Sequence, residues 1–507
     1  MSSPTTSIPA SSPTSWDSGR LKRPVCAAAQ EILFDRHLRP SAEPVAAELQ
    51  LISQVDRAHL VMLVEQGIAA PEAAQRLLEG IERLRKAHFG PLIDLPAPRG
   101  RYLAYESYLI DTLGPDVGGI LHSGRSRNDL NATVIRLRLR EPYDRLLAEC
   151  DLLGRRLLSD GRRYAAVTMP AYTHHQPAVP ITYGHYLVGV AAALVRDMAD
   201  LWNAGEEIEQ NPLGAGAVGG TSLPIDPRRT TRLLGFSEPL ANSVHAVASR
   251  DVVLRLTSAA AVLGVLLCRV AHDVQHWSSV ESGLLHLADD VVGSSSMMPQ
   301  KRNPFLLEHV QGRATVALGA FTAAVSAMCT SRFTNAIAVG TEAVAHIWST
   351  LEAATDAVVL LRLVLEGAEP DAARMRQSAV EGQTVATHLA ERLVSAGMPF
   401  RSAHHRVGAI AVEALETGRP LEDVARQRLP QYGPAVWSGL DPDAVAATAN
   451  YGGGPGPGAL EAALPDVGAR LTDLRRRAAR RRRRWAEAAA ELDAAVHDIL
   501  TNHQKTA

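Results

Sequence analysis

The stretch RDVVLRLTSAAAVLGVLLCRVAHDV, residues 250–274, decides the fold class of this chain. Its apolar residues recur at three- and four-residue spacing, which predicts a helix from about Asp251 to Asp273. The helix is apolar nearly all round, so we expect it to be buried on every side. The stretches 44–68 and 184–202 repeat the pattern, while period-two runs of β-branched residues are scarce. The sequence therefore predicts a mainly α fold.

Helices of this kind are difficult to cover within one chain. We therefore expect them to meet copies from other subunits in a helix bundle, which would make the protein a homo-oligomer. A large monomeric bundle is the alternative.

The composition excludes several functional classes. The 507 residues are 46% hydrophobic and 21% charged, with a net charge of −2, so no general attraction to nucleic acid or anionic membranes is implied. The four cysteines show no paired spacing, which favours a reducing, cytoplasmic location over a disulfide framework or zinc site. The uncharged apolar stretch between Arg255 and Arg269 is too short to cross a bilayer.

Polar and glycine-rich breaks divide the chain. They lie at 114–129, near Glu381 and, within the last part, at 450–460. We predict a disordered leader that lacks a secretory pattern, an N-terminal helical domain, a central helix-bundle domain and a C-terminal helical domain, at 1–20, 21–125, 126–380 and 381–507.

Eight arginines stand in the ten positions of RRRAARRRRR, residues 475–484. A nucleic-acid patch is one interpretation. Since the chain has no net basicity and Trp485 is the one aromatic beside the run, we favour a solvated helix.

Three polar loops interrupt the helical pattern. The first loop is HSGRSRNDLNAT (122–133), the second loop is MPAYTHHQPAVPITYGHY (169–186), and the third loop is GSSSMMPQKRNP (293–304). Each holds Arg, Asn, Ser, Thr or Lys donors suited to a carboxylate, although a single polar loop is more often a surface turn. None holds an acidic cluster, and the neighbours His174 and His175 would point apart. Together the loops predict an anion site and no metal.

A glycine motif offers a competing interpretation. Gly214, Gly216 and Gly219 match G-x-G-x-x-G, with Glu238 about twenty residues on, as in a dinucleotide site. The preceding residues, NAGEEIEQNPL, are polar and form no β-strand. We therefore discount a nucleotide site.

In combination, the three loops resemble the argininosuccinate lyase branch of the fumarase/aspartase superfamily. The family motifs G-S-S-x-M-P-x-K-x-N-P, H-T-G-R-S-R-N-D and Y-T-H-L-Q correspond to SSSMMPQKRNP, HSGRSRND and YTHHQ. PLGAGAVGGTSLPID (212–226) and NSVHAVASRD (242–251) are also similar, and the likeness runs from about Ile32 to the C-terminus.

The resemblance implies a three-domain fold and a homotetramer with a central twenty-helix bundle, in which each active site takes its three loops from three subunits. The implied reaction is β-elimination of an N-substituted aspartate to fumarate and an amine, without a cofactor. Its partners would be small molecules, not nucleic acid or a membrane.

Residue roles follow from the resemblance. Ser295 would be the catalytic base, acting as an alkoxide under a closing lid. Lys301 would stabilise the doubly charged aci-carboxylate. His174, oriented by Glu308, could protonate the departing nitrogen, although a structural helix-cap histidine is the alternative. The implied substrate-binding residues are Ser126, Arg127, Asn128, Thr173, Ser296, Met298, Asn303, Phe305 and Phe333.

The amine side departs from the family. In SRFTNAIAVGTE (331–342), Phe333, Ala338 and Thr341 replace the usual tyrosine, glutamine and lysine, and Phe305 replaces an aspartate. Phenylalanine and alanine cannot solvate a guanidinium. We therefore predict an amine smaller or less polar than arginine, in elimination or in reverse addition. Ethylenediamine-disuccinate (EDDS) lyase is a relative that accepts another amine. True argininosuccinate lyase and a non-catalytic protein on this fold are the alternatives.

Overall fold

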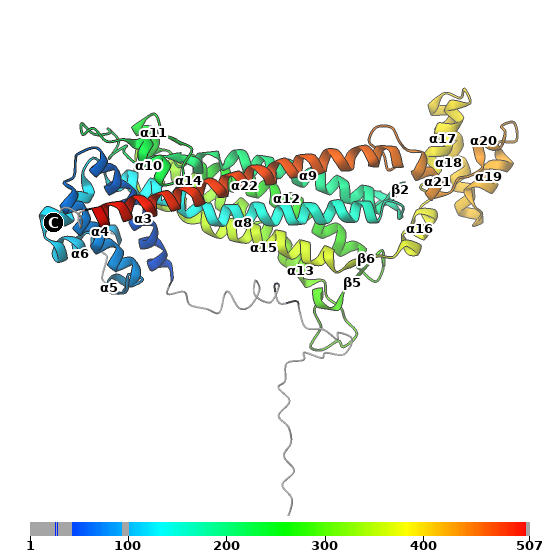
Figure 1. The fold of residues 1–507 in the computed structure, drawn as a ribbon. Coiled ribbons are helices and arrows are strands. Elements are labelled where there is room, and N and C mark those ends of the chain that lie inside the picture. Colours follow the sequence, from blue (N-terminus) through cyan, green and yellow to red (C-terminus); the bar gives the residue numbers. More distant parts are fainter. Residues whose placement is uncertain (1–25, 27, 29–42, 94–100, 503–507) are drawn as a thin grey trace, which may run out of the picture.

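The computed structural model describes residues 26, 28, 43–93 and 101–502. Its body is an elongated bundle of long helices, with a smaller group of helices at each end (Figure 1). Strands in this part of the chain are few and short, which confirms the mainly α prediction. The predicted leader, 1–20, lies outside the described residues.

The N-terminal group of helices has its own apolar core, to which the start of α8 and the end of α22 also contribute. Its elements are α3 (Glu43–Glu65), α4 (Pro71–Lys86), α5 (Gly90–Ile93), α6 (Arg101–Leu113), α7 (Pro115–Gly118) and η2 (Gly119–His122).

The central bundle contains the long helices and three two-stranded sheets. The pair β1–β2 is an antiparallel hairpin, β5–β6 is antiparallel, and β3–β4 is parallel. The elements are α8 (Arg127–Arg163), β1 (Thr168–Thr173), β2 (Gln176–Thr182), α9 (Tyr183–Ala204), η3 (Glu206–Glu209), β3 (Gln210–Asn211), α10 (Pro227–Leu233), β4 (Glu238–Pro239), α11 (Ser243–Ala248), α12 (Asp251–Trp277), β5 (Leu285–Leu287), η4 (Asp289–Val291), α13 (Phe305–Ala314), α14 (Val316–Cys329), η5 (Ala338–Glu342), α15 (Ala343–Glu366) and β6 (Ala368–Pro370).

Helices α8 and α15 run parallel. The Arg138 guanidinium lies over the Trp348 ring, 4.0 Å from its centroid. Further along both helices, Arg156 donates to the carbonyl of Leu365 at 3.3 Å. The start of α15 therefore lies at the same end of the bundle as the start of α8.

Helix α12 runs antiparallel to α13 and α14. Near the end of α12, Gln311 donates to Gln275 at 2.8 Å, and earlier in α12 Gly264 packs against Ala314. A Cβ at Gly264 would stand 2.3 Å from the Ala314 carbonyl oxygen, so this close crossing requires glycine.

Helix α12 begins at the predicted residue and extends four residues beyond the predicted end. It is not fully covered within one chain, because Val262 and Val265 are 50% and 60% exposed. The sequence-based expectation of no membrane-length segment counted only the uncharged residues between Arg255 and Arg269. Two helical segments that also include a few charged residues, Asp251–Trp277 and Phe305–Cys329, are long and apolar enough to cross a membrane. Core helices of soluble proteins share these properties, so the finding alone is weak evidence for a membrane protein.

The chain after Glu381 forms two distinct parts. Apolar residues between Val385 and Val445 make a separate small core, whereas α22 lies back along the bundle against α8 and α9. The predicted domain 381–507 thus combines a small helical cluster with a bundle-length helix, and its boundaries remain a prediction. Helix α16 (Ala372–Glu381) leads into this part, whose elements are α17 (Ala386–Ser395), α18 (Phe400–Thr417), α19 (Leu421–Arg428), α20 (Pro434–Trp437), α21 (Pro442–Thr448) and α22 (Pro457–Asn502).

Candidate active site

The third loop leads into α13 and is closed at its neck. Gly293 and Asn303 exchange two backbone hydrogen bonds of 2.8 Å, and the Asn303 side chain donates to the carbonyl of Ser294 at 3.3 Å. Arg302 is ion-paired with Asp289 and donates to a β5 carbonyl at 2.6 Å. These contacts fix the neck, while most of the loop between its two ends is exposed.

Ser295 has a distinctive environment within this loop. Its Oγ accepts hydrogen bonds from the backbone N–H groups of Met297 and Met298, at 3.3 and 3.0 Å. Serine turns of this kind are common in loops. Two amides directed at one oxygen also stabilise that oxygen when it is deprotonated, as in an oxyanion hole. The geometry therefore fits the predicted base.

Lys301, Ser296 and Glu308 are all exposed in the single chain. No ion pair connects the Lys301 ammonium to another described residue, so this cation is available to an anion. Glu308 lies in the first turn of α13. Within the described part of the chain, no hydrogen bond or ion pair joins Glu308 to His174, and their pairing remains a prediction.

Phe305, the first residue of α13, packs against the neck of the third loop. A Cβ at Gly293 would stand 2.9 Å from the Phe305 ring, so the ring leaves no room for a side chain at position 293. Phe305 is partly exposed, and it adds an apolar surface beside Asn303.

His174 and His175 form the two-residue turn of the β1–β2 hairpin, between the paired residues Thr173 and Gln176. Their φ angles are 54° and 60°, a conformation that costs a non-glycine residue about 1–2 kcal/mol. The His175 ring lies 6.4 Å from that of His276 on α12. The helix-cap alternative for His174 is therefore wrong. Its exposed, strained position marks it as a functional candidate.

The first loop ends in the N-terminus of α8. Ser126 is the N-cap, and its Oγ accepts from the backbone N–H of Asn128 at 3.3 Å. The Asn128 side chain donates to the carbonyl of Ala217 at 3.2 Å, which ties the helix start to the glycine-rich loop. The hydroxyl hydrogen of Ser126 and the remaining amide groups of Asn128 can meet a carboxylate beside the exposed Arg127.

The carboxylate of Asp129 organises this end of the site. Its Oδ1 accepts from the backbone N–H of Ser126 at 2.8 Å, and its Oδ2 accepts from those of Gly214 and Gly216 at 2.9 and 3.0 Å. Both glycines have positive φ angles, 103° and 61°. The glycine-rich loop therefore binds the buried Asp129 carboxylate through its backbone N–H groups. Sequence reasoning missed Asp129, although S-x-x-D is a capping-box signal.

Arg125 anchors the first loop to the N-terminal helices. Its guanidinium contacts Asp56 at 2.5 Å and the hydroxyl of Tyr102 at 2.9 Å, and all three side chains are buried. Burial alone would lower the pKa of Arg125, but the charges and hydrogen bonds of Asp56 and Tyr102 together outweigh it and raise this pKa above its usual value. The loop is thus held by a charged pair whose members stand far apart in sequence.

Two histidines complete this support. His59 Nε2 lies 2.8 Å from the carbonyl of Ser123, so this nitrogen carries the hydrogen. Burial, followed by the charge of Arg125, holds the pKa of His59 well below its usual value. His122 Nδ1 forms a hydrogen bond with Glu106 Oε1. Sequence reasoning singled out neither His59 nor Glu106.

The candidate residues lie at opposite ends of the bundle. Ser126 precedes α8, whose 37 residues span about 55 Å. The hairpin with His174 follows the far end of α8, and the third loop precedes α13 at that same end (Figure 1). One chain therefore brings the second and third loops to one end and leaves the first loop at the other.

Residues 331–342 lie at the α8-start end, between α14 and α15. The segment contains η5, a π-helical turn of a kind often found at functional sites. Phe333 and Ile337 are 67% and 72% exposed. The segment therefore presents an apolar surface at the same end as the first loop.

The described residues contain no group of three or more His, Cys, Asp or Glu side chains arranged to hold a metal ion. The side chains at the three loops are donors and cations, which suit an anionic substrate.

Comparisons with known proteins agree with this geometry. A family model described as lyase matches residues 69–319, and one described as argininosuccinate lyase C-terminal matches residues 383–448. The argininosuccinate lyase of Halobacterium salinarum is 36% identical over 429 residues, covering 82% of this chain and 85% of that protein. Argininosuccinate lyase 1 of Shouchella clausii is 33% identical over 401 residues, covering 79% and 80%.

Solved structures show the same fold. An EDDS lyase variant with bound fumarate superposes with a TM-score of 0.87 at 29% identity, covering 96% of this chain and 98% of that one. The class II fumarase of Schistosoma mansoni has a TM-score of 0.69 at 16% identity, covering 84% and 96%, and shows the likeness of fold alone.

These matches support an enzyme over a non-catalytic protein on this fold. The two apolar segments fit bundle helices of a soluble protein, and the cytoplasmic location remains a prediction. The chain therefore belongs to the argininosuccinate lyase branch of the fumarase/aspartase superfamily, and it is a fumarate-releasing carbon–nitrogen lyase.

Proposed function

We propose that this enzyme cleaves an N-substituted L-aspartate whose amine portion is less polar than arginine, or forms that adduct from fumarate and the amine. The observation that carries the proposal is the exposed apolar surface of residues 331–342, where Phe333 and Ile337 face solvent. The family uses this region to hold the arginine portion of its substrate. An apolar amine gains from burial against it, whereas a guanidinium would lose its water without replacement.

Proton removal falls to Ser295. A neutral serine is a weak base, so it must act as an alkoxide. The amides of Met297 and Met298 already point at its Oγ and would stabilise the negative charge. The nearby positive charge of Lys301 would stabilise it further once the loop closes and water leaves.

Loss of the Cβ proton places a second negative charge on the adjacent carboxylate. Lys301 and Asn303 would hold this aci-carboxylate, with the amides around Ser296 and Met298 as further donors. Interactions that strengthen as charge develops lower the barrier, whereas uniform substrate binding does not. Ser126, Asn128 and Thr173, supported by Arg127, would hold the other carboxylate.

The departing nitrogen needs a proton. His174 stands at an exposed hairpin tip, from which it can enter the site of a neighbouring subunit. Glu308 would orient its imidazole and stabilise the imidazolium. Since the first loop lies at the other end of the bundle, the complete site requires more than one chain, and we propose the homotetramer as the active form.

The structural relatives are consistent with a changed amine pocket. The EDDS lyase variant with bound fumarate has an aspartate and a tyrosine replaced by methionine. In this chain, Phe305 and Phe333 stand where the family has an aspartate and a tyrosine. The fumarate bound to that variant supports the proposal that fumarate binding is compatible with apolar side chains in place of an aspartate and a tyrosine.

The test incubates the purified enzyme with fumarate and a panel of amines, from alkyl and aryl amines to arginine, and detects adducts by mass. The proposal predicts adducts of apolar amines and little or no argininosuccinate. The ultraviolet absorbance of fumarate then follows the reverse reaction for each adduct. Rapid cleavage of argininosuccinate, or growth rescue of an arginine auxotroph, would overturn the proposed specificity.

True argininosuccinate lyase is the second candidate, favoured by relatives of that name at 33–36% identity. A variant carrying Phe333→Tyr, Ala338→Gln and Thr341→Lys restores the family's polar side chains. If the proposal is right, this variant gains kcat/KM for argininosuccinate by about tenfold or more, the effect of one restored charge-assisted hydrogen bond. If the wild type already prefers argininosuccinate, the change brings no such gain.

A further inference from the structure

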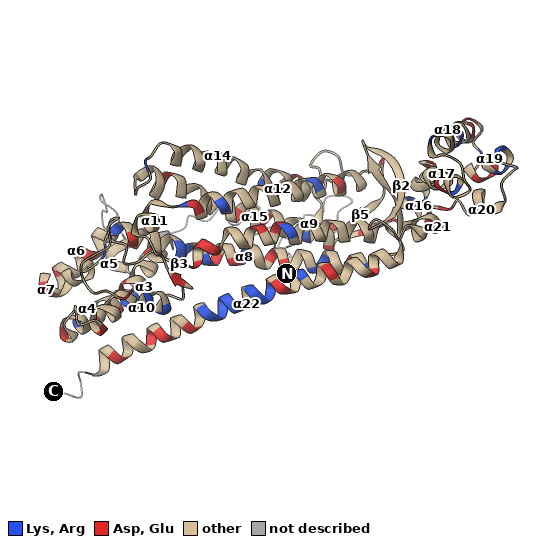
Figure 2. Ribbon diagram, turned by 90° about the horizontal axis from the view of Figure 1, so that it is seen from above, with Lys and Arg blue, Asp and Glu red and all other residues tan. Residues whose placement is uncertain are grey.

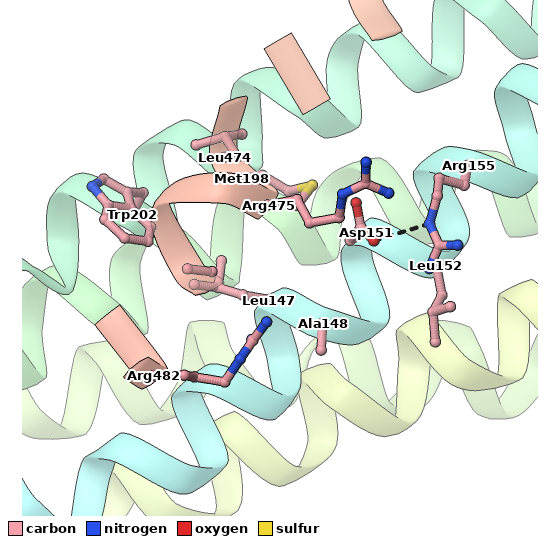
Figure 3. A pocket seen from close by; sticks show the side chains of 11 residues that line it. Leu147, Ala148, Asp151, Leu152, Arg155, Met198, Trp202, Leu474, Arg475 and Arg482 are labelled. Atoms are coloured by element: carbon pink, nitrogen blue, oxygen red, sulfur yellow. Dashed lines mark hydrogen bonds and ion pairs between the residues drawn. The ribbon is translucent and has the colours of Figure 1, made fainter. Parts of the chain in front are cut away.

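The arginine-rich run of α22 borders a cleft that the lyase reaction does not use. The cleft lies between α8, α9 and α22 and has a volume of about 310 Å³ (Figure 3). Figure 2 shows the concentration of positive charge along this part of α22. Asp151 on its wall is 24 residues, or about 36 Å, along α8 from Arg127, so the cleft is remote from the first loop.

The floor of the cleft is apolar. Leu147, Met198, Trp202 and Leu474 contribute side chains from three helices (Figure 3), and Ala478 also lines the cleft. A volume of this size accommodates a compact ligand such as a branched or aromatic side chain.

The rim provides one guanidinium without a partner. Arg155 donates to Asp151 at 3.0 Å, and Arg482 contacts Asp144 at 3.2 Å. Arg475 also lines the cleft, but no hydrogen bond or ion pair joins it to another described residue. An anionic group entering the cleft would therefore meet Arg475 without breaking an existing pair.

Asp151 supplies the complementary group. It is 7% exposed, its Oδ2 accepts from Arg155, and its buried Oδ1 has no hydrogen-bond partner among the described residues. Such an oxygen costs free energy unless a donor reaches it. In Figure 3 the carboxylate lies beside Arg475, yet no ion pair joins the two. A ligand with one anion and one donor could bridge them.

We propose that this cleft binds an apolar α-amino acid, with its carboxylate on Arg475, its ammonium on the Asp151 carboxylate and its side chain on the apolar floor. Each recognition element of the cleft then meets its chemical complement. The inference does not depend on the identity of the substrate amine, because none of these residues belongs to the three loops.

Other arginines of the run hold α22 in place. Arg481 is 3% exposed and lies 4.7 Å from the Tyr143 ring centroid and 4.4 Å from that of Trp202. Arg484 is ion-paired with Glu209. The expected solvated helix is therefore correct for part of the run and wrong for Arg481, whose cation stacks on aromatic rings.

Isothermal titration of the intact enzyme with L-leucine and L-phenylalanine tests the proposal. We expect saturable binding, with 4-methylpentanoate and 3-methylbutylamine at least about tenfold weaker because each lacks one charged group. Arg475→Met should weaken amino-acid binding by about tenfold or more. Arg476→Met, an exposed neighbour that does not line the cleft, is the matched control and should bind as wild type. Both variants should retain lyase activity.

Absence of amino-acid binding would overturn the proposal. Equal affinity in the wild type and Arg475→Met would also overturn it, because the ligand would then occupy another site, such as the amine pocket. Equal losses of amino-acid affinity in Arg475→Met and Arg476→Met would show a nonspecific effect of charge. This result would also overturn the proposal. Failure of the proposed lyase substrate would leave these results unaffected.

Discussion

Ser295 lies between Ser294 and Ser296 in the third loop. Among these three serines, in the described part of the chain, only Ser295 has an Oγ that accepts hydrogen bonds from two backbone N–H groups. The other two hydroxyls lack this arrangement. A base needs its conjugate charge stabilised, so position within the turn, and not residue type, distinguishes the three serines.

Ser295→Ala should lower kcat for fumarate release by a factor of about 10² to 10⁴, the usual contribution of a general base. Helix content and oligomer size should stay as in the wild type, because the side chain is part of an exposed turn. Ser294→Ala is the matched control and should retain most activity. Ultraviolet absorbance of fumarate measures both, and an active Ser295→Ala enzyme would move the base elsewhere.

His59 connects the first loop to pH. Its pKa is held well below the usual value, first by burial and next by Arg125, so the folded protein keeps it neutral. Below a pH of about 6.5 the unfolded chain binds a proton there and the folded chain does not. Stability is therefore fully present above that pH and is lost as the pH falls toward the depressed folded value.

His59→Gln keeps a donor for the carbonyl of Ser123 but cannot take up a proton. Denaturant unfolding at pH 8 and pH 5.5 should show the wild type losing up to about 1.4 kcal/mol more than the variant between the two conditions. Parallel losses in both proteins would contradict the assignment of a buried neutral histidine.

At the scale of elements, the start of α8 and the glycine-rich loop behave as one unit because Asp129 joins them. Its two oxygens accept from the backbone of Ser126, Leu130, Gly214 and Gly216. The position of Ser126 and Asn128 thus depends on a loop that is some 85 residues further along the chain.

Asp129→Asn should destabilise the protein by about 2 kcal/mol or more, since an amide NH2 group would face buried N–H donors. It should also raise KM more than it lowers kcat, because the carboxylate-binding residues lose their support. Asp226→Asn, at the partly exposed N-cap of α10, is the control and should change stability little. An unchanged KM in Asp129→Asn would separate the glycine loop from substrate binding.

The sequence was sufficient for the long helices, since apolar residues at period 3.6 must be buried. Helix α12 begins at Asp251 as predicted and continues to Trp277. The hairpin β1–β2 was not predicted, because prolines interrupt its alternation and its turn uses two histidines in place of glycine or asparagine. Its turn conformation follows from the paired strands on either side.

The candidate site was predictable as a set of loops but not as a structure. Local motifs singled out Ser295 and Asn128. Contacts such as Asp56 with Arg125 join residues 69 positions apart, and no local pattern encodes them. The sequence therefore indicates the candidate residues of the site, whereas the contacts that support them follow only from the fold.

At the scale of the whole molecule, the separation of the loops is the main constraint. The first loop and residues 331–342 lie at one end of the bundle, and the third loop and His174 lie at the other. The exposed apolar face of α12 at Val262 and Val265 offers a surface by which chains could pack. If two chains packed so that opposite ends of their bundles met, the first loop of one chain and the third loop of the other would form one site.

The most direct test of a site shared between subunits is to mix two inactive variants, Asn128→Ala and Ser295→Ala, which alter opposite ends of the bundle. Each is unfolded and then refolded alone or with the other, and fumarate release is measured on assemblies shown to contain both chains. If each site takes its first and third loops from different subunits, random mixing restores roughly a quarter of wild-type activity. Mixed assemblies as inactive as the separate variants would contradict a site in which Ser295 acts beside Asn128 of a neighbouring subunit.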